Sequence, residues 1–266
     1  MKWGDKFYSE IETTIEKGAI EAYEDNIFMV FRHSDFESRM IESLIVVNVA
    51  KLLLKWALPN YYQVHMEYPL KDFYHGAFPA LTWKEKASIF DSNNMIRRKN
   101  HNPSGNKSGR IDIALTRETH NEGIYISPNW KSKVGIEIKS INQPTNKIVN
   151  DIERLSYGLA LSDDVGDNSI KAGYSLFYRR LDKPNEVITQ AEIVKKKSLE
   201  LQFWSDKTTD LKSRYPTLDY SIKEIVIKEA AFEKIKDSYD SEYFDYNEVA
   251  DNSGLVVCYL VKIVRP

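Results

Sequence analysis

Two short segments of the chain carry charged residues where a buried β-strand would be apolar. The segment Arg110–Leu115 contains Asp112, and the segment Val134–Ser140 contains Glu137 and Lys139. Because successive strand side chains point to opposite faces, these charges should point away from the apolar residues of their own segments, which are Ile111, Ile113, Leu115, Val134, Ile136 and Ile138. If the strands are neighbours, two carboxylates and one ammonium meet on one patch, and charges are rarely buried unless they are paired or bind a metal.

This combination of residue types is suited to holding a hard divalent cation. Mg²⁺ prefers a few protein oxygens and keeps several waters, so Asp112, Glu137 and the backbone carbonyl of Ile138 are candidate ligands. A metal held there would stabilise charge on a phosphate oxygen and make a coordinated water a better nucleophile. Lys139 would orient that water or neutralise charge on the phosphoryl group. The predicted chemistry is phosphodiester hydrolysis with Mg²⁺, for which Mn²⁺ could substitute.

A helix predicted over residues 36–56 carries one charged residue on its apolar side. At 100° per residue, Glu42 falls inside the apolar arc, which is formed by Ile41, Ile45, Val49, Leu52, Leu53 and Trp56. Glu42 is therefore a candidate to add a metal ligand or to hydrogen-bond a metal-bound water. Glu37 and Glu67 are rivals for this place. The alternative for Glu42 is a boundary residue that reaches solvent or pairs with a lysine.

The elements that must position these residues alternate between helix and strand. Hydrophobic periodicity predicts further helices and strands, which are helices over residues 9–23, 146–162, 190–201 and 229–238 and strands over residues 61–70, 172–180, 222–228 and 255–264. Across residues 36–180 the order is helix, three strands, helix and strand, which is a mixed α/β order. We expect residues 1–35 to be an N-terminal helical extension and residues 181–266 to be an elaboration packed on the same domain.

The charged residues also match the active-site signature of a known superfamily. Asp112, followed after 24 residues by Glu137, Ile138 and Lys139, resembles the motif of the PD-(D/E)xK nucleases. The resemblance implies that Asp112 and Glu137 bind Mg²⁺ and that Lys139 is the lysine of the motif. It also implies that Glu42 stands for the glutamate that many members place on their first helix.

The resemblance has consequences for the fold and the substrate. It implies a restriction-endonuclease-like core over residues 36–180, with a mixed central sheet flanked by helices, and a Mg²⁺-dependent endonuclease that acts on DNA. The stand-alone length, without helicase or methylase motifs, suits a restriction or phage-defence enzyme by analogy with the fold. The need to cut two strands suggests a homodimer. Two departures are that Ile111 replaces the proline of the motif and that Glu153 replaces the glutamine of a Gln-x-x-x-Tyr motif found in exonuclease-like members.

A basic segment lies just before the first charged strand. The stretch "RRKNHNPSGNKSGR" is rich in Asn, Gly and Ser, which is typical of an exposed loop. Since one end of this loop leads into the predicted site, its cations are candidates for phosphate contact, and they are Arg97, Arg98, Lys107 and Arg110. A solvated surface loop is the alternative interpretation.

Composition sets broad limits on the class of protein. The chain has 266 residues, of which 42% are hydrophobic and 29% are charged, and its formal net charge is -2, so no global excess of positive charge indicates a nucleic-acid binder. The single cysteine, Cys258, excludes an intrachain disulfide and a zinc finger. No apolar segment is long enough for a signal peptide or a membrane span. We expect a cytoplasmic protein that does not bind membranes.

Two other functions are compatible with the same residues. In the first, the protein is a non-catalytic nucleic-acid-binding or structural module, and Asp112, Glu137 and Lys139 form a structural ion-pair cluster. In the second, the chemistry is retained but the substrate is RNA or branched DNA. Divalent-metal binding separates the first alternative from the enzyme, and a comparison of substrates decides the second.

Overall fold

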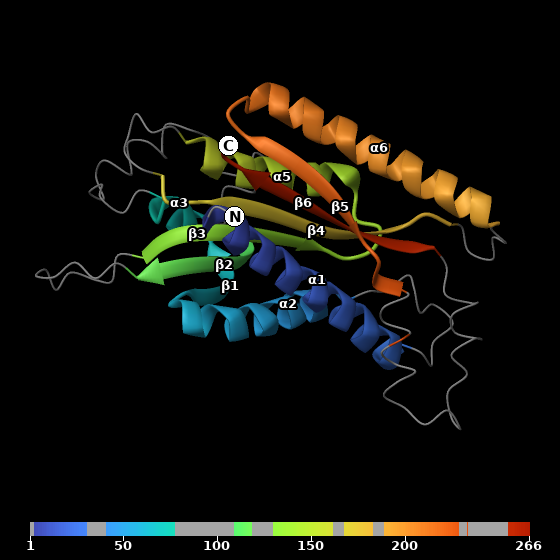
Figure 1. The fold of residues 1–266 in the computed structure, drawn as a ribbon, viewed down its shortest axis with the longest axis horizontal. Coiled ribbons are helices and arrows are strands. Elements are labelled where there is room, and N and C mark those ends of the chain that lie inside the picture. The colour runs from blue at the N-terminus through green and yellow to red at the C-terminus, as the bar shows by residue number, and fades with distance from the viewer. Residues whose placement is uncertain are drawn as a thin grey trace, which may run out of the picture.

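The computed structural model describes eight parts of the chain, which are residues 3–30, 41–77, 109–118, 130–161, 168–182, 189–228, 233 and 255–266. Their strands form a single mixed sheet, and their helices lie on both faces of that sheet (Figure 1). The mixed α/β class expected from the sequence is therefore confirmed.

The sheet has six strands in the order β1-β2-β3-β4-β6-β5. Its strands are β1 (Gln63–Pro69), β2 (Arg110–Glu118), β3 (Trp130–Lys139), β4 (Ala172–Arg180), β5 (Asp219–Ile225) and β6 (Val256–Val264). β3 and β4 run parallel, as expected for strands joined by a helical crossover, and every other neighbouring pair is antiparallel. Residues from the C-terminal third of the chain thus complete the same sheet as the predicted core.

Among the described helices, two cover one face of the sheet and three cover the other. α1 (Trp3–Val30) and α2 (Glu42–Ala57) pack on the first face, and α2 is followed by the short 3₁₀ helix η2 (Leu58–Asn60). α3 (Leu70–His75), α5 (Thr145–Ala160) and α6 (Gln190–Arg214) pack on the second face. α6 begins with a capping box in which Thr189 and Glu192 satisfy each other's backbone N–H groups.

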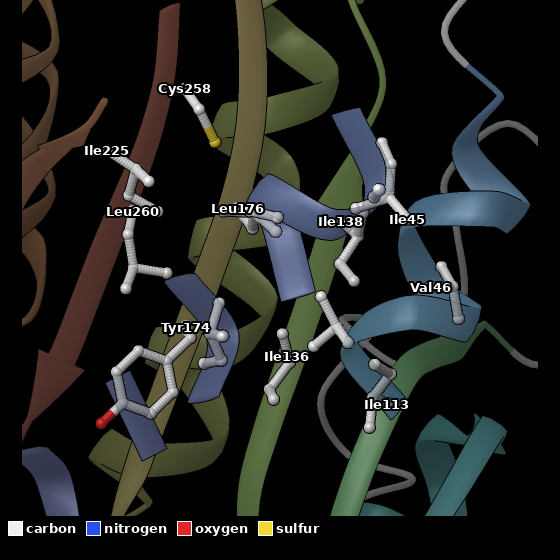
Figure 2. Packing of buried hydrophobic residues seen from close by; sticks show 14 of the residues in the cluster. Ile45, Val46, Ile113, Ile136, Ile138, Tyr174, Leu176, Ile225, Cys258 and Leu260 are labelled. Atoms are coloured by element: carbon white, nitrogen blue, oxygen red, sulfur yellow. The ribbon is translucent and has the colours of Figure 1, made fainter. Parts of the chain in front are cut away.

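The core follows the two faces of the sheet. Along β4 and β6, alternate residues enter the cluster under α1 and α2, and the intervening residues enter the cluster under α5 and α6. Figure 2 shows the first cluster, in which side chains of α2 and of five strands meet, including Ile45, Ile113, Ile136, Leu176 and Leu260. Because β4 is buried on both faces, its sequence is nearly continuous in apolar residues.

Several predicted boundaries need correction. The first helix is longer than the predicted 9–23, since α1 covers residues 3–30, and α6 extends to Arg214 instead of residue 201. In the helix predicted over residues 36–56, the described part starts at Glu42 and ends at Ala57, where Pro59 prevents continuation. The sequence did not predict α3, and nearly all of the helix expected over residues 229–238 lies outside the described residues.

One predicted side-chain orientation is also wrong. Ile113 and Leu115 pack under α1 and α2 as expected, whereas Ile111 belongs to the cluster under α5. The reason is local, because the regular pairing of β2 with β3 stops at Ile113. Strict alternation of faces is therefore lost in the two residues before it, one of which is Asp112.

Gly18 sets the distance between α1 and α2. A Cβ atom built on Gly18 would lie 2.7 Å from the Cα atom of Val49, and that backbone atom cannot move cheaply. We expect Gly18→Ala to lower the free energy of unfolding by about 1–3 kcal/mol, as measured by urea denaturation. Gly109→Ala is the matched control because its nearest contact would be 3.4 Å from a flexible Leu70 methyl group, and an equal loss at both positions would contradict the explanation.

Within the described residues, no helix combines the length and the apolarity that crossing a bilayer requires.

Candidate active site

The sheet is locally open around Asp112. In the pairing of β1 with β2, Met66 is opposite Ile113 and Tyr68 is opposite Ile111, so the register passes over Asp112 and Glu67. Glu67 has a left-handed backbone with φ of 52°, which is uncommon for a residue other than glycine. On the other side, the pairing of β2 with β3 stops at Ile113, so Asp112, the residue before it, is not paired with β3. The carboxylate of Asp112 is therefore presented at a break in both ladders.

The side chain of Asp112 replaces a missing ladder bond. Its Oδ2 accepts a hydrogen bond of 2.6 Å from the backbone N–H of Ile138 in β3. This bond ties Asp112 to the segment that carries Glu137 and Lys139, and it is charge-assisted and correspondingly strong. The predicted convergence of the three residues on neighbouring strands is present in the structure.

Glu137 is the most deeply buried member of the group. Its side chain is only 1% exposed, and its Oε1 accepts a hydrogen bond of 2.6 Å from Nη2 of Arg154 in α5. Its other oxygen, Oε2, is buried and has no hydrogen-bond partner. Burial of a carboxylate is costly unless it is paired, and Arg154 is the partner that compensates Glu137.

Lys139 lies among oxygen atoms from four parts of the chain. Its Nζ donates a hydrogen bond of 2.7 Å to the carbonyl of Ile138 and lies 3.0 Å from Oδ2 of Asp151, 3.5 Å from Oδ2 of Asp112 and 3.6 Å from Oε1 of Glu42. The ammonium therefore contacts Asp112, Glu42 and the Ile138 carbonyl, which are among the groups that were predicted to hold a metal or its water.

Glu42 reaches the site from the first turn of α2. Besides Lys139, its carboxylate contacts the backbone N–H of Ser140, which donates to Oε2 at 3.4 Å. At 39% exposed, Glu42 is the most solvent-accessible of these groups. The position on the apolar side of the helix that singled out Glu42 therefore does place it at this cluster. Of its rivals, Glu67 pairs with Arg110 at 3.5 Å and Glu37 lies outside the described residues.

Two residues of α5 complete the arrangement, and one of them, Asp151, was not predicted. Asp151 and Arg154 are one helical turn apart, and Nη2 of Arg154 bridges Asp151 and Glu137. A sequence signal existed for Asp151, because it falls at the border of the apolar face of α5, which is formed by Ile148, Ile152, Leu155 and Leu159. The six side chains that meet here are called the charged cluster below, and they are Glu42, Asp112, Glu137, Lys139, Asp151 and Arg154.

The environment of the charged cluster raises the pKa values of both Glu137 and Lys139. Burial, and then the neighbouring Asp151, raise the pKa of Glu137, against the lowering effects of Arg154 and Lys139. For Lys139, burial lowers the pKa, but Asp151, Asp112, Glu137 and Glu42 together raise it above the ordinary lysine value. Lys139 is thus a permanent cation at neutral pH, so it can donate hydrogen bonds and stabilise negative charge but cannot serve as a base in this state.

The donor set of the charged cluster fits a hard divalent cation. Four carboxylates face two cations, so the fully ionised cluster has a net charge of −2. The buried Oε2 of Glu137 has no hydrogen-bond partner, and oxygen donors of this kind suit Mg²⁺. Among the described residues, however, no group of three or more His, Cys, Asp and Glu side chains is arranged as a formed metal site, because Lys139 and Arg154 lie between the carboxylates.

Of the four cations predicted to contact phosphate, only Arg110 lies in the described part of the chain. Arg110 is 62% exposed at the start of β2, two residues before Asp112, and its partner is Glu67. Arg97, Arg98 and Lys107 lie outside the described residues. The interpretation of that loop as a nucleic-acid contact therefore rests on Arg110 and on the sequence.

Comparison of the chain with protein-family models, with curated proteins and with solved structures found no match. What the chain does must therefore be inferred from the chemistry of the charged cluster and of its surroundings.

Proposed function

We propose that the protein is a metal-dependent phosphodiesterase that hydrolyses DNA, with the charged cluster as its active site. The observation that carries the proposal is the convergence of Asp112, Glu137 and Lys139 at the point where the sheet opens, with Glu42 beside them. Two acids and one permanent cation at one opening can hold and polarise a phosphate group, whose own charge would otherwise be repelled by carboxylates alone.

The order of the elements supports the restriction-endonuclease-like core that the sequence resemblance implies. From α2 to β4 the main elements are one helix, three consecutive strands that are neighbours in the sheet, the helix α5 and a parallel strand. Such a core places Asp112 and Glu137 on adjacent strands. The proposal of this fold rests on the element order together with the position of the motif.

Each predicted site residue has a defined role in the proposed reaction. Asp112 and Glu137 would hold Mg²⁺, with the Ile138 carbonyl as a further oxygen, and the ion would supply positive charge and a more acidic water. Lys139 donates hydrogen bonds toward the phosphoryl oxygens, because its raised pKa keeps it charged. Glu42, the most exposed acid of the charged cluster, orients water at the mouth of the site.

The proposal is tested by incubating the protein with linear and plasmid DNA in Mg²⁺ or Mn²⁺. We expect cleavage that is abolished by EDTA and reduced by about 10²–10³-fold in Asp112→Asn, the size of effect seen when one electrostatic stabiliser is lost. Asp219→Asn is the matched control, because Asp219, at the start of β5, forms an exposed ion pair with Lys212 of α6. Absence of cleavage on duplex DNA, branched DNA and RNA alike, or equal cleavage by both variants, would refute the proposal.

A second candidate function is a non-catalytic module in which the charged cluster is purely structural. Its support is that Glu137 is almost fully buried and that Lys139 and Arg154 already pair with the carboxylates. Calorimetric titration with Mg²⁺ separates the two functions. The enzyme requires metal binding that disappears in Glu137→Gln, whereas the structural module predicts no binding in either protein.

A further inference from the structure

A group of four positively charged residues lies at the other end of β2 and β3 from the charged cluster. Arg117 in β2 is directly opposite Lys131 in β3, and Lys133 lies two residues further along β3. The backbone N–H of Lys171, just before β4, donates a hydrogen bond of 2.7 Å to the carbonyl of Lys133. These four residues, Arg117, Lys131, Lys133 and Lys171, are called the basic cluster below.

A β-bulge lies within the basic cluster. Leu115 pairs with Val134 and Thr116 pairs with Ser132, so Lys133 is the extra residue of β3. The guanidinium carbon of Arg117 lies 5.8 Å from the ring centre of Tyr62, which packs against Trp56 of α2, so Arg117 is on the α1–α2 face. Residues directly opposite in a sheet share a face, which places Lys131 there as well, and Lys133 is close enough to both to feel their charges.

Within the described part of the chain, the charges of the basic cluster have no acidic partner. Across the described residues, none of the four side chains forms an ion pair with an acid, although acids elsewhere in the sheet are paired. Like charges placed opposite each other in a sheet destabilise it. Burial, and then Lys171, Lys131 and Arg117, lower the pKa of Lys133 from its ordinary value to about 8, so burial and the three neighbouring cations all disfavour its charge.

We propose that the basic cluster binds phosphate groups of the nucleic-acid backbone at a distance from the site of cleavage. The polymeric identity of the ligand rests on the proposed function, whereas its negative charge is inferred from four neighbouring cations that have no acidic partner among the described residues. Lys139 lies six residues after Lys133 along β3, which is about 20 Å at the rise of a strand. Three neighbouring strands span about 10 Å, so the basic cluster suits successive phosphates of one chain better than a single small anion.

The test is a binding measurement that does not depend on catalysis. Fluorescence anisotropy with a labelled duplex in EDTA, at 50–300 mM KCl, compares the unaltered protein with a triple variant that carries Lys131→Gln, Lys133→Gln and Lys171→Gln. We expect the slope of log Kobs against log salt to become shallower by about 2–3, since each lost phosphate contact removes about 0.9. The control triple variant carries Gln at exposed lysines elsewhere, which are Lys51, Lys55 and Lys195, and it should retain the original slope.

A second measurement distinguishes a binding role from a structural one. Lys133→Met removes an unfavourable charge, so we expect its Tm without nucleic acid to rise while its affinity for the duplex falls. A structural lysine would instead lose stability on substitution and leave binding unchanged, and that result would overturn the inference.

The outcomes also separate this inference from the proposed function. A slope that is unchanged in the basic-cluster variant, or a wild-type protein that does not bind the duplex, overturns the inference even if DNA is cleaved in Mg²⁺. A shallower slope supports it even if no condition gives cleavage. A Tm increase of the wild type with inorganic pyrophosphate, without any binding of the duplex, would assign the basic cluster to a small phosphate ligand and overturn the nucleic-acid site.

Discussion

Arg154→Met is expected to lower the free energy of unfolding by about 3–5 kcal/mol, the cost of leaving a buried charge without its partner. Arg154 is the only described side chain whose donors contact the carboxylates of both Glu137 and Asp151, and Glu137 is 1% exposed. Without the guanidinium, Glu137 must either remain buried and ionised or take up a proton. Urea denaturation in EDTA measures the loss.

Removal of the Glu137 charge as well should restore much of the free energy of unfolding that Arg154→Met loses. In the double variant Arg154→Met with Glu137→Gln, no uncompensated charge remains at Glu137, so we expect at least half of the lost stability to return. The control is Arg214→Met, which removes the more exposed ion pair between Arg214 of α6 and Glu153 of α5. Surface pairs of this kind contribute only about 0–1 kcal/mol. A loss at Arg154 no larger than at Arg214 would show that the buried pair does not hold Glu137.

Lys139→Met should reduce cleavage by about 10²–10³-fold, the largest effect on activity expected from a substitution that leaves every carboxylate in place. The ammonium is the only described cation in contact with Asp112, Glu42 and Asp151 together. Its removal leaves the charged cluster more negative, so folding should become more dependent on a divalent cation.

This prediction has a readout that does not depend on activity. We expect the increase in Tm caused by Mg²⁺ or Ca²⁺ to be larger in Lys139→Met than in the wild type, because the variant has no internal cation to compete. Lys147→Met, at an exposed position on α5, is the matched control for both measurements. A variant that cleaves DNA normally, or whose Tm responds to the metal less than that of the wild type, would contradict the assigned role of Lys139.

The part of the site that lies on strands could be predicted because strand periodicity is local. Asp112, Glu137 and Lys139 each interrupt an apolar alternation, and a face assignment needs only period two. The break in the ladders at Asp112 could not be predicted, because it depends on pairing with two other strands. Ile111 was placed on the wrong face for the same reason.

The contribution of α5 depends on how closely the helix packs, which no local pattern encodes. Leu155 of α5 lies so close to Gly135 of β3 that a Cβ atom there would be 2.8 Å from a Leu155 methyl carbon. This close approach brings Asp151 and Arg154, on the same helix, to Glu137. In the sequence, the two residues look like an ordinary helical ion pair of the i, i+3 kind, so only the packing reveals that they belong to the charged cluster.

The position of the last strand has a consequence for how the chain folds. β6 follows β5 in the sequence but lies between β4 and β5, and β5 pairs with no other described strand. Until β6 docks, β4 presents a long apolar edge of the type that recruits foreign strands, and β5 has no described strand with which to pair. Assembly should therefore be slow and cooperative at its final step, and this late step is where misfolding and aggregation should compete with the native state.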